Sequence, residues 1–135
     1  MKRHTTKWPT RRRGSISMEL VLVLPIVLIL FSGIVEFSFL LYARGDVIQA
    51  ARNGARLASV GTVSEESVTE EVRRTLGPRY GETVQVASLL GESSGDEVIV
   101  KVEVPMSVTA PNLLWPIGYD LRGRNLIAET RMLKE

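Results

Sequence analysis

The sequence predicts an α+β protein with a long N-terminal transmembrane helix that continues into a small extracytoplasmic domain of helices packed on a short antiparallel sheet. Three observations predict this class: a long apolar run near the N-terminus, helical spacing of small and apolar residues after it, and a later change to alternating apolar residues. The chain has 135 residues. About ninety remain beyond the apolar run, which is enough for one modest core.

The apolar run has the length of a membrane span. Leu20–Val35 contains no charged residue, and the run resumes after Glu36 and continues to Ala43. At about 1.5 Å per residue, the stretch Leu20–Tyr42 extends roughly 35 Å, whereas the hydrocarbon core of a bilayer is about 30 Å thick. A domain this small cannot cover a helix that is apolar on all sides. We therefore expect residues 15–43 to form a transmembrane helix.

The charges predict the orientation of this helix. Residues 1–14 contain six basic side chains and no acidic one, and the rest of the chain has eleven basic residues against fifteen acidic ones. Positively charged flanks stay in the cytoplasm. We expect a single-pass protein of the inner membrane, with residues 1–14 cytoplasmic and residues 44–135 extracytoplasmic. The basic arm therefore serves to orient the helix in membrane lipid. No nucleic-acid partner is expected.

Glu36 is the one charged residue inside the apolar run. An ionisable group within the membrane costs about 2.5–3.5 kcal/mol on the insertion scale, so it is a functional candidate. Two interpretations remain open. Glu36 contacts a buried partner on a neighbouring helix, or it lies shallowly enough to reach the outer interface.

The helix is expected to extend beyond the membrane to Val60, because Asp46–Val60 has no proline and is followed by Gly61. Small side chains lie on one face of this segment at helical spacing. They permit close packing, either on the chain's own sheet or on a helix of another subunit. The candidate assembly face consists of Ala51, Gly54, Ala55 and Ala58.

The rest of the domain is predicted as one helix and three strands. Glu65–Leu76 has apolar residues four apart, with Ser64 as a suitable N-cap. Between the last two strands lies an apolar loop, residues 111–123, that either caps the sheet or forms a contact surface. The strands are expected at residues 83–90, 98–104 and 126–133.

The residue inventory argues against an enzyme. The chain has no cysteine and one histidine, and that histidine is His4, in the basic arm. Ser-His and Cys-His catalysis and the usual zinc sites are therefore not expected in the domain. No phosphate loop or dinucleotide fingerprint occurs, so we expect no cofactor and no metal.

The segment before the apolar run resembles the processing site of type IV prepilins. Gly14 is followed by Ser15 and, four residues later, by Glu19, between an arginine cluster and a hydrophobic helix. The resemblance implies cleavage by a prepilin peptidase between Gly14 and Ser15. It also implies that Glu19 pairs with the new amine on a neighbouring subunit.

Further blocks resemble the TadE-like family of minor pilins, or pseudopilins, of the tight-adherence (Tad, Flp-type) pilus system. These blocks are Leu24-Pro25, Glu36-Phe37, residues 41–44 and residues 50–59. The resemblance implies a structural subunit whose partners are other pilin-like subunits and inner-membrane platform proteins. The alternative is an unprocessed, membrane-anchored binding or accessory module of the cell envelope.

Overall fold

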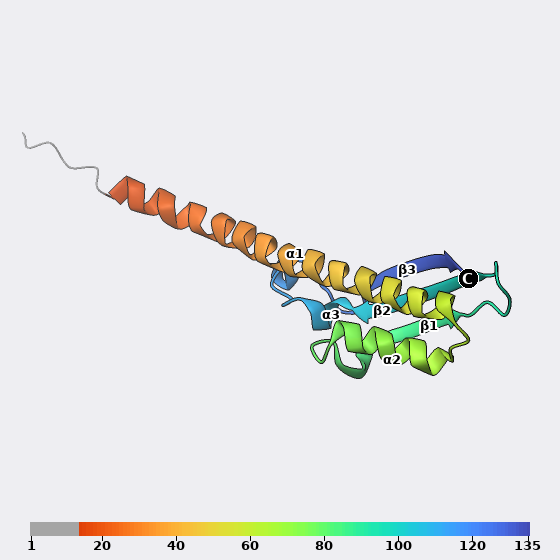
Figure 1. The fold of residues 1–135 in the computed structure, drawn as a ribbon. Helices are drawn as coiled ribbons and strands as arrows, with labels where there is room; N and C mark the ends of the chain where they lie inside the picture. The colour runs from red at the N-terminus through yellow and green to blue at the C-terminus, as the bar shows by residue number, and fades with distance from the viewer. Residues whose placement is uncertain (1–13) are drawn as a thin grey trace, which may run out of the picture.

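A computed structural model describes residues 14–135 of the chain. Residues 1–13, which make up nearly all of the expected leader, lie outside the described residues. A single helix, α1 (Gly14–Val60), dominates the molecule. Its N-terminal part projects away from the folded domain, and its C-terminal part packs against that domain (Figure 1). Its 47 residues correspond to a length of roughly 70 Å.

The other elements form a small α+β domain, as the sequence predicts. One three-stranded antiparallel sheet has the strand order β1-β2-β3. In chain order the elements are α2 (Glu65–Leu76), η1 (Gly81–Thr83), β1 (Gln85–Leu89), β2 (Glu97–Pro105), α3 (Met106–Thr109), η2 (Trp115–Ile117) and β3 (Asn125–Leu133).

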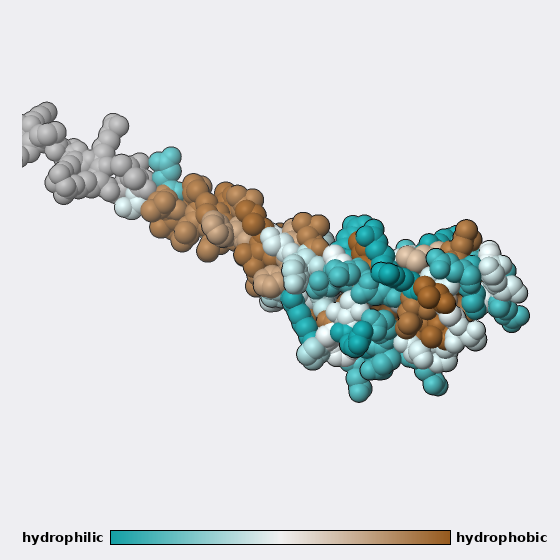
Figure 2. Space-filling view, in the orientation of Figure 1, coloured by the Kyte–Doolittle hydropathy of each residue, from teal (hydrophilic) through white to brown (hydrophobic). Residues whose placement is uncertain are grey.

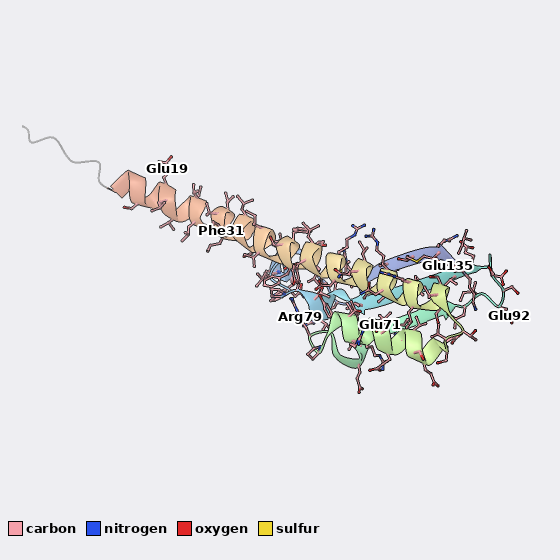
Figure 3. All side chains as sticks on the ribbon, in the orientation of Figure 1. Glu19, Phe31, Glu71, Arg79, Glu92 and Glu135 are labelled. Atoms are coloured by element: carbon pink, nitrogen blue, oxygen red, sulfur yellow. The ribbon has the colours of Figure 1, made fainter. Side chains whose placement is uncertain are left out.

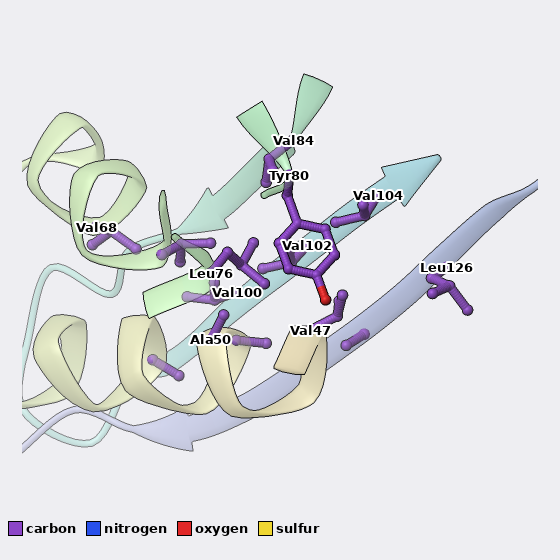
Figure 4. Close-up of a cluster of buried hydrophobic side chains, with 14 of the residues drawn as sticks. Val47, Ala50, Val68, Leu76, Tyr80, Val84, Val100, Val102, Val104 and Leu126 are labelled. Carbon is purple, nitrogen blue, oxygen red and sulfur yellow. The ribbon is translucent and has the colours of Figure 1, made fainter. Parts of the chain in front are cut away.

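The core lies between the sheet and the two longer helices. The four valines of β2 that alternate along the strand are all fully buried, and they face α1 and α2. Figure 4 shows Val100 and Val102 beside Ala50 of α1 and Leu76 of α2. The alternation that predicted this strand therefore arises because one face of the sheet is covered and the other is open.

The boundaries of α2 agree with its sequence signals. Ser64 Oγ accepts a hydrogen bond from Ser67 N at 3.3 Å, which caps the helix. At the other end, Gly77 has a φ of 74° and donates its N–H to Arg73 O at 2.9 Å. A positive φ favours glycine, so the helix ends where the sequence places Gly77.

Three segments differ from the expected pattern. The first strand starts at Gln85 rather than at residue 83, because Thr83 Oγ1 donates to Tyr80 O at 2.6 Å and closes a 3₁₀ turn. Pro105 ends β2 and initiates the short helix α3, which the sequence did not predict. The apolar loop after α3 contains the 3₁₀ turn η2.

Gly54 marks the closest approach of α1 to the rest of the core. A Cβ atom there would lie 2.8 Å from Val72 Cγ2, and 3.4 Å from both Val100 Cγ1 and Val68 Cγ1. Branched valines cannot rotate away freely. We expect Gly54→Ala to lower the free energy of unfolding by up to about 2 kcal/mol, since overpacking costs roughly 1–3 kcal/mol and the gain in helix propensity offsets about 1 kcal/mol of it.

Gly45 provides the matched control on the same helix. A Cβ atom at Gly45 meets nothing within 4 Å. Gly45→Ala should therefore raise the free energy of unfolding by about 0.5–1 kcal/mol. Denaturant unfolding in detergent micelles measures both variants. Equal stabilisation by the two substitutions would contradict the packing described here.

Candidate functional site

The N-terminal part of α1 is an exposed apolar rod. Every side chain from Ser17 to Phe31 is exposed, and nearly all of them are aliphatic or aromatic. The hydrophobic surface covers this part of the helix on the visible side, whereas the domain carries a mixed surface (Figure 2). It belongs to the one helix in the described part of the chain that is long and apolar enough to cross a membrane. An apolar surface of this size indicates single-pass membrane anchoring.

Glu36 lies where this rod meets the domain, and it is completely buried. Its Oε2 accepts hydrogen bonds from Leu113 N at 2.5 Å and from Leu114 N at 2.9 Å. Its Oε1 has no hydrogen-bond partner among the described residues. Glu36 thus fixes the segment from Pro111 to Tyr119, hereafter the 111–119 loop, to the side of α1.

Apolar contacts support the same junction. Leu40 of α1 packs with Ala110 and Leu121 in a small cluster separate from the main core. The ring of Phe37 lies 5.6 Å from the ring of Tyr119, centroid to centroid. Glu36 is therefore surrounded by hydrophobic side chains that exclude water, which strengthens its hydrogen bonds to the loop.

Two arginines lie beside aromatic rings at the same end of the domain. The guanidinium carbon of Arg79 lies 5.7 Å from the Phe39 ring centroid and 5.9 Å from that of Tyr42. That of Arg124 lies 4.9 Å from the Tyr119 centroid. Arg79 projects from the domain end that faces the apolar rod (Figure 3). Arginine side chains and aromatic rings thus lie together at α1 just beyond Glu36.

The candidate processing residues lie at the far end of the rod. Gly14 and Ser15 belong to the first turn of α1. Glu19 is exposed, and Figure 3 shows it projecting from the helix far from the domain. Among residues 17–135, no hydrogen bond or ion pair joins Glu19 to another side chain of the chain. Its pairing with a neighbouring subunit stays a prediction.

The candidate assembly face lies against the chain's own domain. Its three alanines, Ala51, Ala55 and Ala58, are buried in the main core, and Gly54 contacts α2 and β2. This is the first of the two alternatives that the small residues allowed. A contact of this face with another subunit would require α2 and the sheet to move away, and it stays a prediction.

Sequence reasoning missed the partner of Glu36. The expected partner lies on a neighbouring helix, and that contact stays a prediction. In the structure, the groups that bind Glu36 are two amides of the chain's own loop. Backbone amides carry no side-chain signal. The spacing of Glu36, Leu40, Ala43 and Val47 does carry one, because all four are buried on one face of α1.

The part of the chain that contains Glu36 matches a known protein family. Residues 14–56 match the TadE-like protein family. The resemblance predicted from the sequence is confirmed over this range. The TadE-like segment starts at Gly14, includes the whole apolar rod and Glu36, and ends within the part of α1 that packs on the sheet.

The family match covers about a third of the chain, and α2 and the sheet lie beyond it. No curated protein and no solved structure matches the chain significantly. A TadE-like segment implies a component associated with the Tad pilus, and the TadE-like family is not a family of enzymes. Among residues 14–135, no group of histidine, aspartate and glutamate side chains is arranged to hold a metal ion.

Proposed function

We propose that this protein is a pseudopilin-like structural subunit of a Tad pilus or secretion assembly. The observation that carries the proposal is the TadE-like match, which begins at the glycine of the prepilin-like site and continues along the apolar rod. In this proposal residues 1–14 are a cytoplasmic leader, residues 15–43 cross the inner membrane, and residues 44–135 form the extracytoplasmic domain.

Glu19 has the properties that subunit recognition requires. Cleavage after Gly14 would create an amine at Ser15, and Glu19 is an exposed carboxylate one helical turn further along α1. A carboxylate exposed to lipid is unfavourable unless a partner neutralises it. Pairing between Glu19 and the amine of a neighbouring subunit would therefore set the register between packed helices. The partners are the prepilin peptidase, other pilin-like subunits and platform proteins of the inner membrane.

Processing is the first test of this function. We expect the protein extracted from membranes to begin at Ser15, as measured by intact mass and N-terminal sequencing, in cells that contain a prepilin peptidase. Gly14→Ala should leave a chain that begins at Met1 and should abolish incorporation into the assembly. A wild-type chain that begins at Met1 in such cells would contradict the proposal and favour an unprocessed anchor.

Recruitment is tested separately from cleavage. Glu19→Leu should be cleaved but should fail to co-purify with the other pilin-like subunits. Met18→Leu changes the neighbouring exposed residue without changing charge, so it is the matched control and should assemble normally. Normal co-purification of Glu19→Leu would exclude the pairing proposed for this carboxylate.

A further inference from the structure

We propose that the 111–119 loop is a second membrane-contacting element, which inserts its apolar side chains into the outer leaflet beside α1. This inference goes beyond the proposed structural role. It depends on α1 crossing the membrane, but not on processing or on pilus assembly. In this proposal, the apolar surface of the loop contacts lipid.

The position of the loop along α1 is the first argument. Leu114 and Ile117 line an apolar groove with a volume of about 450 Å³ together with Ile29, Ile34 and Phe37 of α1. The loop therefore reaches back along the helix to the level of Ile29, seven residues before Glu36. In Figure 1 the short blue turn that contains η2 lies beside α1, at the end of the domain nearest the apolar rod.

The length of the membrane span then places the loop in lipid. A helical span needs about 20 residues. If the span starts at Ser15, directly after the basic arm, it ends near Ile34, and if it starts at Leu20 it ends near Phe39. Ile29 and Ile34, which line the groove with Leu114 and Ile117, lie inside the hydrocarbon region in both cases, and Phe37 does so in the second. A span that stopped before the loop would be only about 20 Å long, too short for the bilayer.

The exposed side chains of the loop are apolar. Trp115, Ile117 and Leu113 have exposed fractions of 65%, 55% and 42%. No charged residue occurs between Leu113 and Tyr119. Three large apolar side chains on one short loop, continuous with the surface of a membrane helix, mark a contact with a membrane rather than with water. Tryptophan in particular is enriched at membrane interfaces.

Most of the backbone N–H groups of the loop have partners within the chain, as a medium without water requires. Lipid cannot hydrogen-bond to peptide groups, so irregular backbone at this depth needs internal partners. Pro111 and Pro116 have no N–H. Hydrogen bonds within the chain satisfy the N–H groups of Leu113, Leu114, Ile117, Gly118 and Tyr119.

The cationic and aromatic residues beyond the loop fit the headgroup region. Arg79 and Arg124 are exposed and lie beside Phe39, Tyr42 and Tyr119. Arginine attracts lipid phosphates, and tyrosine rings favour the interface between hydrocarbon and water. Phe39 and Tyr42, with Arg79 beside them, follow the α1 residues that line the groove with the loop, in the direction away from the cytoplasm. The order along α1 is therefore hydrocarbon first and headgroups next.

Tryptophan fluorescence in lipid vesicles tests the inference on the full-length chain. The protein has two tryptophans, so Trp8→Phe leaves Trp115 as the only one. The purified variant is reconstituted in vesicles of phosphatidylethanolamine and phosphatidylglycerol, with or without bromine high on the acyl chains, and iodide quenching is measured in parallel. We expect Trp115 to lose most of its emission in the brominated vesicles and to be protected from iodide.

Two probes in a chain that also carries Trp115→Phe provide the references. Phe31→Trp replaces a residue in the apolar rod that is 65% exposed, and Leu89→Trp replaces one on β1 that is 60% exposed. The first should be quenched by brominated lipid and the second by iodide. The inference is wrong if brominated lipid quenches Phe31→Trp but does not quench Trp115. Quenching of Trp115 by iodide would show that water covers the loop, and quenching by neither agent would show that a protein surface covers it. If Phe31→Trp is not quenched by lipid, the membrane span itself fails and the inference fails with it.

Discussion

Replacing Glu36 with leucine should lower the free energy of unfolding of the domain by roughly 1–3 kcal/mol. The substitution removes the acceptor of the buried Leu114 N and one of the two acceptors of the part-buried Leu113 N, which also donates to Pro111 O. A buried donor that is left without a partner costs about 1–3 kcal/mol. Denaturant unfolding in micelles gives the free energy, and hydrogen exchange shows where the loss occurs, because the amide of Leu114 should lose its protection.

Glu36→Gln is the matched variant. Its amide oxygen still accepts hydrogen bonds, so the side chain keeps its shape and most of its function as an acceptor. We expect slower exchange at Leu114 than in Glu36→Leu, and a loss of stability that is smaller. Unchanged amide exchange in Glu36→Leu would show that the carboxylate does not hold the 111–119 loop.

Tyr80 should make the stability of the domain fall steeply at high pH. Its hydroxyl donates a hydrogen bond to Asp46 Oδ2 at 2.7 Å, and the ring lies buried among core side chains next to α1 (Figure 4). Burial, followed by the hydrogen bond and the negative charge of Asp46, raises the pKa of Tyr80 from 10.0 to about 12. The unfolded chain therefore loses this proton at a lower pH than the folded protein does.

The sign of the effect follows from this difference. Below pH 10 the contribution of Tyr80 is fully present, and between pH 10 and 12 it is lost, because deprotonation favours the unfolded chain. A difference of about two between the two pKa values corresponds to roughly 3 kcal/mol. Tyr80→Phe should cost about 1–2 kcal/mol at neutral pH, yet it should be the more stable protein near pH 12.

Unfolding curves of both proteins across this pH range provide the measurement. Tyr42 and Tyr119 are retained in both chains, so their titration cancels in the comparison. Parallel pH profiles, with Tyr80→Phe the less stable protein throughout, would contradict the role assigned to the Tyr80–Asp46 hydrogen bond.

Periodicity explains which parts of the fold the sequence predicts. The alternating valines of β2 and the four-residue spacing in α2 depend only on which face is covered, so these elements form close to where they are expected. The start of β1 depends instead on the hydroxyl of Thr83 and its bond to Tyr80 O. Such a local competition between a turn and a strand is not visible in the hydrophobic pattern.

The junction was harder to predict because its partners are far apart in the sequence. Glu36 and Leu113 are 77 residues apart, and the groups that bind Glu36 are backbone amides. The buried positions Glu36, Leu40, Ala43, Val47 and Ala50 follow one another at intervals of four and three. This spacing places Glu36 on the face of α1 that meets the chain's own domain. The signal is visible only when the membrane span and the rest of α1 are treated as one helix.

Site-directed labelling tests most directly the claim that α1 crosses the membrane once and leaves the domain outside the cytoplasm. The chain has no cysteine, so Ser94→Cys, in the exposed β1–β2 turn, and Thr5→Cys, in the leader, each introduce one reactive site. In right-side-out membrane vesicles from cells without prepilin peptidase, an impermeant maleimide should label Ser94→Cys at once. It should label Thr5→Cys only after permeabilisation. The reverse pattern, or recovery of the full chain in the soluble fraction, would contradict the account.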